Sequence, residues 1–334
     1  MFFNFFKKPR VHLYTICWNE EYMLKYFFRH YDGLVDRYVF FDDGSTDQTL
    51  AILRKHPKVE IRPFPRLDEN DSYVLAAQRV HNECWKESRG LADWVIFTAV
   101  DELLYTARLK SYLQTCTRKG VTAIPALGFQ MISPTLPSEN KPLTNLVTKG
   151  CPLVMMNKLS IFDPNKIDET NHIPGRHASE PVGNVKYPEK DVVLLLHYKY
   201  IDFEYTFNRY NELNQKLGLM DKKRGFGYEY AWTRERLKQE WDTFEQNAVT
   251  NVFARGYNAN LQHSPRNERW WRQNEIIIPP PENDVSRLIN RLRPLPYQLW
   301  MKVPEAMRIQ TARLPFMRTL LDTLRYIFLE KGKN

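Results

Sequence analysis

Acidic side chains gather at three points in the first third of the chain, each directly after an apolar segment. The first is the stretch 18–21 (WNEE), the second is the stretch 42–47 (DDGSTD), and the third is the pair Asp101-Glu102. Carboxylate oxygens accept hydrogen bonds from a ribose or a base, and they bind hard divalent cations. Any one cluster alone is typical of the start of a helix, where Asn or Ser caps backbone N–H groups and acidic residues suit the helix dipole.

The segments around these clusters alternate between strand and helix patterns. Apolar runs predict strands, and apolar residues three and four apart predict helices. The predicted strands are residues 11–17, 37–41, 59–62, 94–100 and 121–126, and the predicted helices are residues 20–31, 46–55 and 73–88. Ser45 followed by Gln48 has the capping-box spacing that would open a helix at residue 46.

This alternation predicts an α/β fold with a mostly parallel sheet and helices on both of its faces. Parallel strands place their carboxyl ends at one edge, where such sheets bind ligands. All three acidic clusters follow predicted strands, so we expect them to share that edge. Three clusters in register favour a binding site over three unrelated helix caps.

The first two clusters resemble the opening motifs of bacterial family 2-type glycosyltransferases. Residues 16–21 (ICWNEE) match the "NE" motif of that family, and residues 40–49 (FFDDGSTDQT) match its "DDGSTDxT" motif. The resemblance implies the GT-A fold, a Rossmann-like sheet with the nucleotide over these loops. It implies that the base and the ribose of the nucleotide lie near Asp42 or Asp43. The nucleotide-binding residues that it implies are Asn19, Glu20, Asp42, Asp43, Ser45 and Asp47.

The third cluster resembles the metal motif of the same family. Residues 99–103 (AVDEL) match its "DxDEF" form, with Asp101 at the usual metal-ligand position and Ala99 at the first Asp. Residues 175–183 (GRHASEPVG) and 194–200 (LLLHYKY) resemble the "GxH…PxG…LLHYK" stretch of bacterial members, so that the likeness spans residues 11–232. It implies His197 as the final ligand of Mn²⁺ or Mg²⁺. A single histidine after a strand is otherwise typical of a structural role.

The catalytic base is not selected by any motif. An inverting transfer needs a carboxylate or an imidazole beside the acceptor hydroxyl, whereas a retaining transfer would not need that base. The candidates in this sequence are Glu180, His177, Glu102 and Asp168.

Fixed positive charge could neutralise the leaving diphosphate. Lys199 and Arg209 are candidates for this role, and charges on a solvated helix face are the alternative interpretation.

The second half of the chain predicts a less regular structure. Residues 129–190 are rich in Pro, Asn and Gly, and a strand at 192–197 and helices at 202–217 and 231–250 follow. We therefore expect a GT-A domain over residues 1–250 and a basic, aromatic-rich, helical extension over residues 251–334.

The net charge of +9 is concentrated near the C-terminus, where residues 255–334 contain 14 Lys and Arg against 7 Asp and Glu. Amphipathic patterns at 285–293 and 316–329 suit a helix lying on an anionic membrane, or a helix packed on the catalytic domain. The apolar residues 2–6 are open to the same two interpretations and are too few for a secretory signal.

Other classes of protein fit the sequence less well. No apolar run reaches the length of about 20 residues that spans a bilayer. The chain contains no G-x-G-x-x-G turn and no P-loop, which argues against a dinucleotide-dependent oxidoreductase, a methyltransferase or an NTPase. No nucleic-acid-binding motif accompanies the basic C-terminal charge. Four cysteines, with spacings that match no zinc site or disulfide framework, suggest a reducing cytosol.

The sequence therefore predicts a metal-assisted, inverting glycosyltransferase of polysaccharide biosynthesis. We expect it to move a hexose-type sugar from a nucleotide sugar, most simply a UDP-sugar, to a glycan or lipid-linked acceptor. Its expected location is the cytoplasm, at the inner face of the membrane. The alternative is a catalytically impaired GT-A-fold protein that binds carbohydrate or a membrane surface, an interpretation that Ala99 in the metal motif favours.

Overall fold

The computed structural model describes residues 8–66 and 72–273. The chain divides into two compact units, Met1–Glu275 and Ile276–Asn334, and all described residues belong to the first. The amphipathic patterns at 285–293 and 316–329, and the apolar residues 2–6, lie outside the described residues. Within the described residues, no helix is long and apolar enough to cross a membrane.

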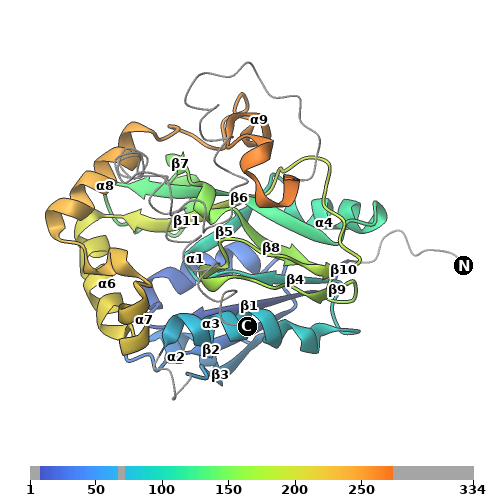
Figure 1. Ribbon diagram of the computed structural model, residues 1–334, viewed down its shortest axis with the longest axis horizontal. Coiled ribbons are helices and arrows are strands. Elements are labelled where there is room, and N and C mark those ends of the chain that lie inside the picture. Colours follow the sequence, from blue (N-terminus) through green and yellow to red (C-terminus); the bar gives the residue numbers. More distant parts are fainter. Residues whose placement is uncertain (1–7, 67–71, 274–334) are drawn as a thin grey trace, which may run out of the picture. The chain divides into compact units, whose positions relative to one another are not determined.

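A large twisted sheet forms the centre of the described unit (Figure 1). Its strands run in the order β3-β2-β1-β4-β8-β6-β11-β5, and β7 pairs with β6. The strands are β1 (Val11–Cys17), β2 (Arg37–Asp42), β3 (Val59–Pro63), β4 (Trp94–Phe97), β5 (Glu102–Tyr105), β6 (Ala123–Ser133), β7 (Gly150–Pro152), β8 (Lys158–Phe162) and β11 (Leu194–Ile201). A separate small ladder pairs β9 (Ile167–Glu169) with β10 (Val182–Gly183).

Helices cover both faces of this sheet. The α-helices are α1 (Glu21–Tyr31), α2 (Thr49–Arg54), α3 (Tyr73–Glu83), α4 (Leu109–Arg118), α5 (Leu143–Leu146), α6 (Phe203–Lys216), α7 (Leu219–Arg224), α8 (Arg234–Gln246) and α9 (Ala259–Gln262). In β1, Leu13 packs into the core under α1 and α4, while Tyr14 packs into the separate core under α3. This alternation places one apolar face of each strand under each helical layer. The predicted α/β class, with a large sheet flanked by helices, is confirmed.

The half of the sheet that carries the acidic motifs is parallel throughout. Strand β1 pairs in parallel with β2 and with β4, and β2 pairs in parallel with β3. Antiparallel pairs occur in the other half, where β8 joins β4 to β6 and β5 joins β11. The carboxyl ends of β1, β2 and β4 therefore lie at one edge, as the sequence predicts.

Two local predictions are wrong. The helix expected from residue 46 begins at Thr49, because the Ser45 hydroxyl accepts a hydrogen bond from the Asn19 backbone N–H (3.0 Å) instead of capping the helix. The strand expected over 94–100 ends at Phe97, and a turn follows it.

The segment 129–190 is more regular than its composition suggests. Strand β6 is buried along its whole length, and β8 lies in the middle of the sheet. Strand β8 begins with Lys158, whose ammonium group is buried against a carboxylate far away in sequence. A local hydrophobic pattern could not reveal this strand.

The described residues after 250 pack into the same compact unit. Val252, Ala259 and Trp271 are buried in its core. Arg269 and Arg272 form buried ion pairs with Asp191. The first compact unit accordingly extends to Glu275, whereas the sequence placed the domain boundary at residue 250.

Candidate functional site

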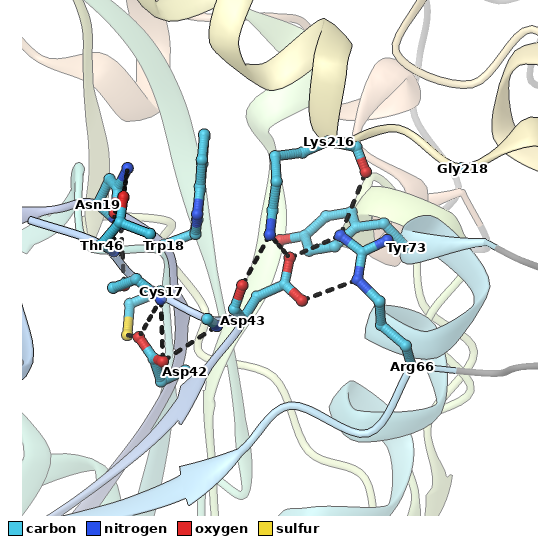
Figure 2. Close-up of polar contacts among 12 residues, drawn as sticks. Cys17, Trp18, Asn19, Asp42, Asp43, Thr46, Arg66, Tyr73, Lys216 and Gly218 are labelled. Carbon is cyan, nitrogen blue, oxygen red and sulfur yellow. Dashed lines mark hydrogen bonds and ion pairs between the residues drawn. The ribbon is translucent and has the colours of Figure 1, made fainter.

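The loops after β1 and β2 are joined to each other by their motif residues. Asn19 has a left-handed backbone (φ 51°), and its side-chain oxygen accepts a hydrogen bond from the Thr46 N–H at 2.8 Å (Figure 2). The Ser45 hydroxyl accepts from the Asn19 N–H, and the Asp47 carboxylate accepts from the Glu21 N–H at 3.1 Å. Asn19, Ser45 and Asp47 thus hold the two loops together.

Asp42 shapes the turn that follows β2. Its carboxylate accepts hydrogen bonds from the backbone N–H groups of Gly44 (3.0 Å) and Ser45 (3.1 Å). Gly44 has a φ of +73°, which glycine adopts without strain. The turn directs Asp43, the next residue of the motif, towards the edge of the sheet.

Two cations bind Asp43, a residue that is only 7% exposed. The Arg66 guanidinium donates to both carboxylate oxygens (2.8 and 2.7 Å) from the segment after β3. Lys216, at the end of α6, donates to the Asp43 carbonyl (2.7 Å) and lies 3.2 Å from its carboxylate (Figure 2). The Arg66 guanidinium also stands 5.7 Å from the centre of the Tyr73 ring.

Trp18 adds a half-buried aromatic ring at the end of β1. The Lys216 ammonium lies 4.8 Å from its centroid, and the Arg209 guanidinium lies 5.0 Å from it. Arg209 also donates to the Trp18 carbonyl (2.6 Å) and to the Glu20 carboxylate (2.8 Å). Burial raises the pKa of Glu20 to about 7, although Arg209 opposes this increase.

The two predicted metal ligands lie next to each other. His197 Nε2 is 3.3 Å from Asp101 Oδ2, and the Tyr198 N–H donates to the Asp101 carbonyl at 2.8 Å. Burial raises the pKa of Asp101, but His197 and Lys199 together lower it below its usual value. A nitrogen and an oxygen ligand each lie about 2.0–2.2 Å from a bound cation. A separation of 3.3 Å therefore fits two ligands of one cation. In the described part of the chain no group of three His, Cys, Asp or Glu residues could hold a metal.

Lys199 lies two residues beyond His197 on β11. Its ammonium is 4.6 Å from the Tyr210 ring centroid and 4.5 Å from the Tyr230 ring centroid. Among the residues that the structure describes, Lys199 forms no ion pair with a carboxylate. It contributes to lowering the pKa of Asp101, so this cation acts on the predicted metal position.

The candidate bases occupy very different surroundings. Both carboxylate oxygens of Glu102 bind buried cations. His177 donates from Nδ1 to the Met155 carbonyl (2.8 Å), and burial lowers the pKa of its imidazole to about 4. Glu180 and Asp168 are exposed, and neither carboxylate binds another residue of the described part of the chain.

Several contributors to the site carry no sequence signal of their own. Arg66 and Lys216 bind Asp43 from distant segments, and Lys158 binds Glu102 from the middle of the sheet. Arg176 lies within the motif at 175–183, and its partner Glu102 lies in the metal motif. The one signal for this contact in the sequence is the arginine between Gly175 and His177 in the motif at 175–183.

Comparisons with known proteins place these features in a family. The chain matches glycosyltransferase family 92 over residues 15–234, a range that includes every site residue named above. No curated protein sequence matches it.

Two solved structures resemble the chain distantly. Glucosyl-3-phosphoglycerate synthase from Mycobacterium tuberculosis, solved with Mn²⁺, UDP and glucosyl-3-phosphoglycerate, shows 17% identity and a TM-score of 0.25. The comparison covers 36% of this chain and 44% of that one, less than half of the solved protein. Residues 1–349 of S. aureus TarS show 11% identity and a TM-score of 0.31 over 78% of this chain and 77% of that one.

The sequence resemblance pointed to the family 2 type, and that finer assignment is not confirmed. The glycosyltransferase class is confirmed, because the family match covers most of the chain and includes the three acidic motifs. By this match, the chain belongs to glycosyltransferase family 92.

Proposed function

We propose that this glycosyltransferase takes its sugar from a nucleotide sugar at the edge formed by β1, β2 and β4. The observation that carries the proposal is the Asp101–His197 pair, 3.3 Å apart, with Lys199 two residues beyond His197 on the same strand. A carboxylate, an imidazole and an ammonium that has no carboxylate partner among the described residues suit a diphosphate bound together with a divalent cation.

Asp101 and His197 would hold Mn²⁺ or Mg²⁺. Such an ion neutralises negative charge that develops on a leaving diphosphate. Lys199 would add fixed positive charge from β11. Arg209 would add a second cation, already oriented by the Trp18 carbonyl and Glu20. Charges that are fixed before the reaction need no reorganisation as the sugar–phosphate bond breaks.

The nucleotide would lie over the joined loops after β1 and β2. Trp18 offers an aromatic surface there, and Asp43 offers a buried acceptor whose position is fixed by Arg66 and Lys216. Asn19, Ser45 and Asp47 support this surface, because their side chains bind backbone N–H groups of the opposite loop. We propose a UDP-sugar as the donor.

For the acceptor hydroxyl, we propose Glu180 as the base of an inverting transfer. A base must have an oxygen or nitrogen free to accept a proton. The Glu180 carboxylate is exposed and has no partner among the described side chains, whereas both oxygens of Glu102 are engaged. The acceptor itself would be a glycan or a lipid-linked glycan.

We further propose that residues 276–334 bring the enzyme to an anionic membrane surface. The support is the basic charge of this segment, which contains 10 Lys and Arg against 5 Asp and Glu. Each basic residue near such a surface contributes about 1 kcal/mol at physiological salt. Sedimentation of the full chain with anionic and neutral vesicles tests this idea, and equal, negligible binding to both would contradict it.

A screen of nucleotide release tests the main proposal. The full chain is incubated with activated sugars carrying UDP, GDP or CDP, with and without Mn²⁺. We expect release from one nucleotide class that depends on Mn²⁺ and is lost in Asp101→Ala. Turnover by Asp101→Ala at the wild-type rate with added Mn²⁺ would refute the metal assignment.

Ala99 favours a second candidate function, a binding protein without transfer. It occupies the position of the first Asp in the predicted metal motif. Calorimetry with the same nucleotides separates the two functions. Nucleotide binding that depends on Mn²⁺, without release of any sugar, would support the binding protein.

A further inference from the structure

We propose that Arg176 and Lys158 are positioning residues that hold Glu102 and, through it, the turn that carries Asp101. This inference rests on the proposed role of Asp101 and His197 in metal binding. It assigns Glu102, a candidate base from the sequence, to the support of that site. It also gives a role to the motif at 175–183.

The three side chains form a buried ion cluster. Lys158 Nζ lies 2.6 Å from Glu102 Oε1, and an Arg176 Nη atom lies 2.6 Å from Glu102 Oε2. Their side-chain exposures are only 7% for Lys158, 3% for Arg176 and 3% for Glu102. Burial alone would raise the pKa of Glu102, but the two cations hold it well below its usual range. Glu102 is therefore a fixed anion with both oxygens occupied.

This fixed anion is bonded directly to the turn after β4. Glu102 Oε2 accepts a hydrogen bond from the Ala99 N–H (3.0 Å), and the Glu102 N–H donates to the Ala99 carbonyl (3.1 Å). Arg176 donates from its other Nη atom to the carbonyl of Phe97, the last residue of β4 (2.7 Å). One guanidinium thus fixes both the end of the strand and the carboxylate that closes the turn. Asp101 lies inside this closed turn.

The backbone conformation of the turn 174–176 directs the Arg176 side chain towards Glu102. Gly175 has a φ of +72°, and Arg176 itself has a φ of +59°. A left-handed conformation is unfavourable for a residue with a Cβ. A Cβ on Gly175 would lie 2.3 Å from His177 Nε2, and the His177 ring is anchored to the Met155 carbonyl. Gly175 and His177 therefore maintain an unfavourable backbone that directs the guanidinium into the interior.

His197 is positioned from the opposite side, because it pairs with Glu102 in the β11–β5 ladder. The Tyr198 N–H holds the Asp101 carbonyl from the same strand. The separation of Asp101 and His197 is consequently determined by the ladder on one side and by Arg176 on the other. A small shift of the turn would change that separation and weaken a shared cation, as loss of outer-shell partners does in metal sites generally.

The test is Arg176→Lys, which keeps the charge but replaces the two Nη atoms that bind Phe97 and Glu102 by a single ammonium. Binding of Mn²⁺ to the full chain is measured by titration without donor, and stability is measured by urea unfolding. Outer-shell changes reduce metal affinity about 10- to 100-fold, and we expect a loss of at least about tenfold here. The matched control is Arg269→Lys, which alters an equally buried guanidinium paired with Asp191. It should lower stability and leave Mn²⁺ affinity unchanged.

The possible outcomes separate the positioning role of Arg176 from the metal site itself. Weaker Mn²⁺ binding in Arg176→Lys than in Arg269→Lys, at similar stability, supports the proposal. Unchanged Mn²⁺ affinity in Arg176→Lys refutes the positioning role and leaves the metal site standing. A wild-type chain that binds no Mn²⁺ overturns both. If Arg176→Lys does not fold, Glu102→Gln, which preserves the side-chain shape, takes its place with the same expectations.

Discussion

Replacing Asp191 by Asn should sharply reduce the stability of the described unit. Its carboxylate is fully buried and is the ion-pair partner of two buried guanidinium groups, those of Arg269 (2.6 Å) and Arg272 (2.7 Å). It also accepts a hydrogen bond from the Trp271 indole at 3.0 Å. Asn keeps the shape of the side chain but removes the negative charge that Arg269 and Arg272 share, so that the buried Arg269 guanidinium loses its ion-pair partner.

The size of the effect follows from this geometry. Removing one partner of a buried ion pair costs about 3–5 kcal/mol, because the remaining charge stays away from water. Urea unfolding of the full chain, followed by tryptophan fluorescence, measures the loss. With a urea dependence of about 2 kcal/mol per molar, the midpoint should fall by about 2 M.

Asp242→Asn is the matched control. Asp242 pairs with Lys238 on the surface of α8, where both side chains are largely exposed. Loss of an exposed pair changes stability by about 0–1 kcal/mol. If Asp191→Asn cost no more than Asp242→Asn, the other partners of the guanidinium groups would be enough to stabilise them. The segment after residue 250 would then not be held by the Asp191 charge.

Three further predictions concern the site and the pH dependence of stability. Lys199→Met should lower kcat about tenfold or more if it removes fixed positive charge from the transition state, and steady-state kinetics showing an unchanged kcat would rule out this role. Glu180→Gln should lower kcat by about 10²-fold or more, as loss of a general base does; Glu189→Gln, at another exposed glutamate, is the control, and equal activity of the two variants would exclude Glu180 as the base. Burial lowers the pKa of His263 from 6.5 to about 4, so the unfolded chain gains a proton between these pH values and the folded chain does not. The contribution of His263 to stability is then complete above pH 6.5 and is lost, by about 3 kcal/mol, as the pH falls towards 4; His263→Gln should reduce the pH dependence of stability in urea unfolding measured across that range, and an unchanged dependence would show that other groups cause it.

The sequence predicts the parallel half of the sheet well, because its signals are local. The strands β1, β2 and β3 match the predicted ranges closely, since buried parallel strands are short apolar runs. Strand β8 was not predicted, since Lys158 at its start is compatible with a buried strand only when Glu102 neutralises it. The capping-box prediction failed for a related reason. The Ser45 hydroxyl is bonded to a backbone N–H 26 residues away, in a different loop.

In the candidate site too, local sequence patterns revealed some residues, whereas contacts between distant segments were not predicted. Asp101 and His197 were identified by motif resemblance, and the structure brings them together. The partners of Asp43 were not predicted, because an arginine after β3 and a lysine at the end of α6 carry no local mark of that contact. Pairing of charges across long sequence separations depends on the topology of the fold. A pattern in one stretch of sequence therefore cannot predict which charges will pair.

The bonding between the loops after β1 and β2 has a consequence for the evolution and engineering of donor choice. The side chains of Asn19, Ser45 and Asp47 each accept a hydrogen bond from a backbone N–H of the opposite loop. They therefore form a shared foundation that different donors can use without alteration. Under the proposed function, a change of sugar or base should arise in side chains beside that foundation, such as Trp18 after β1 and Lys216 at the end of α6. Libraries aimed at new donors should vary these two positions and keep the DDGSTD stretch constant.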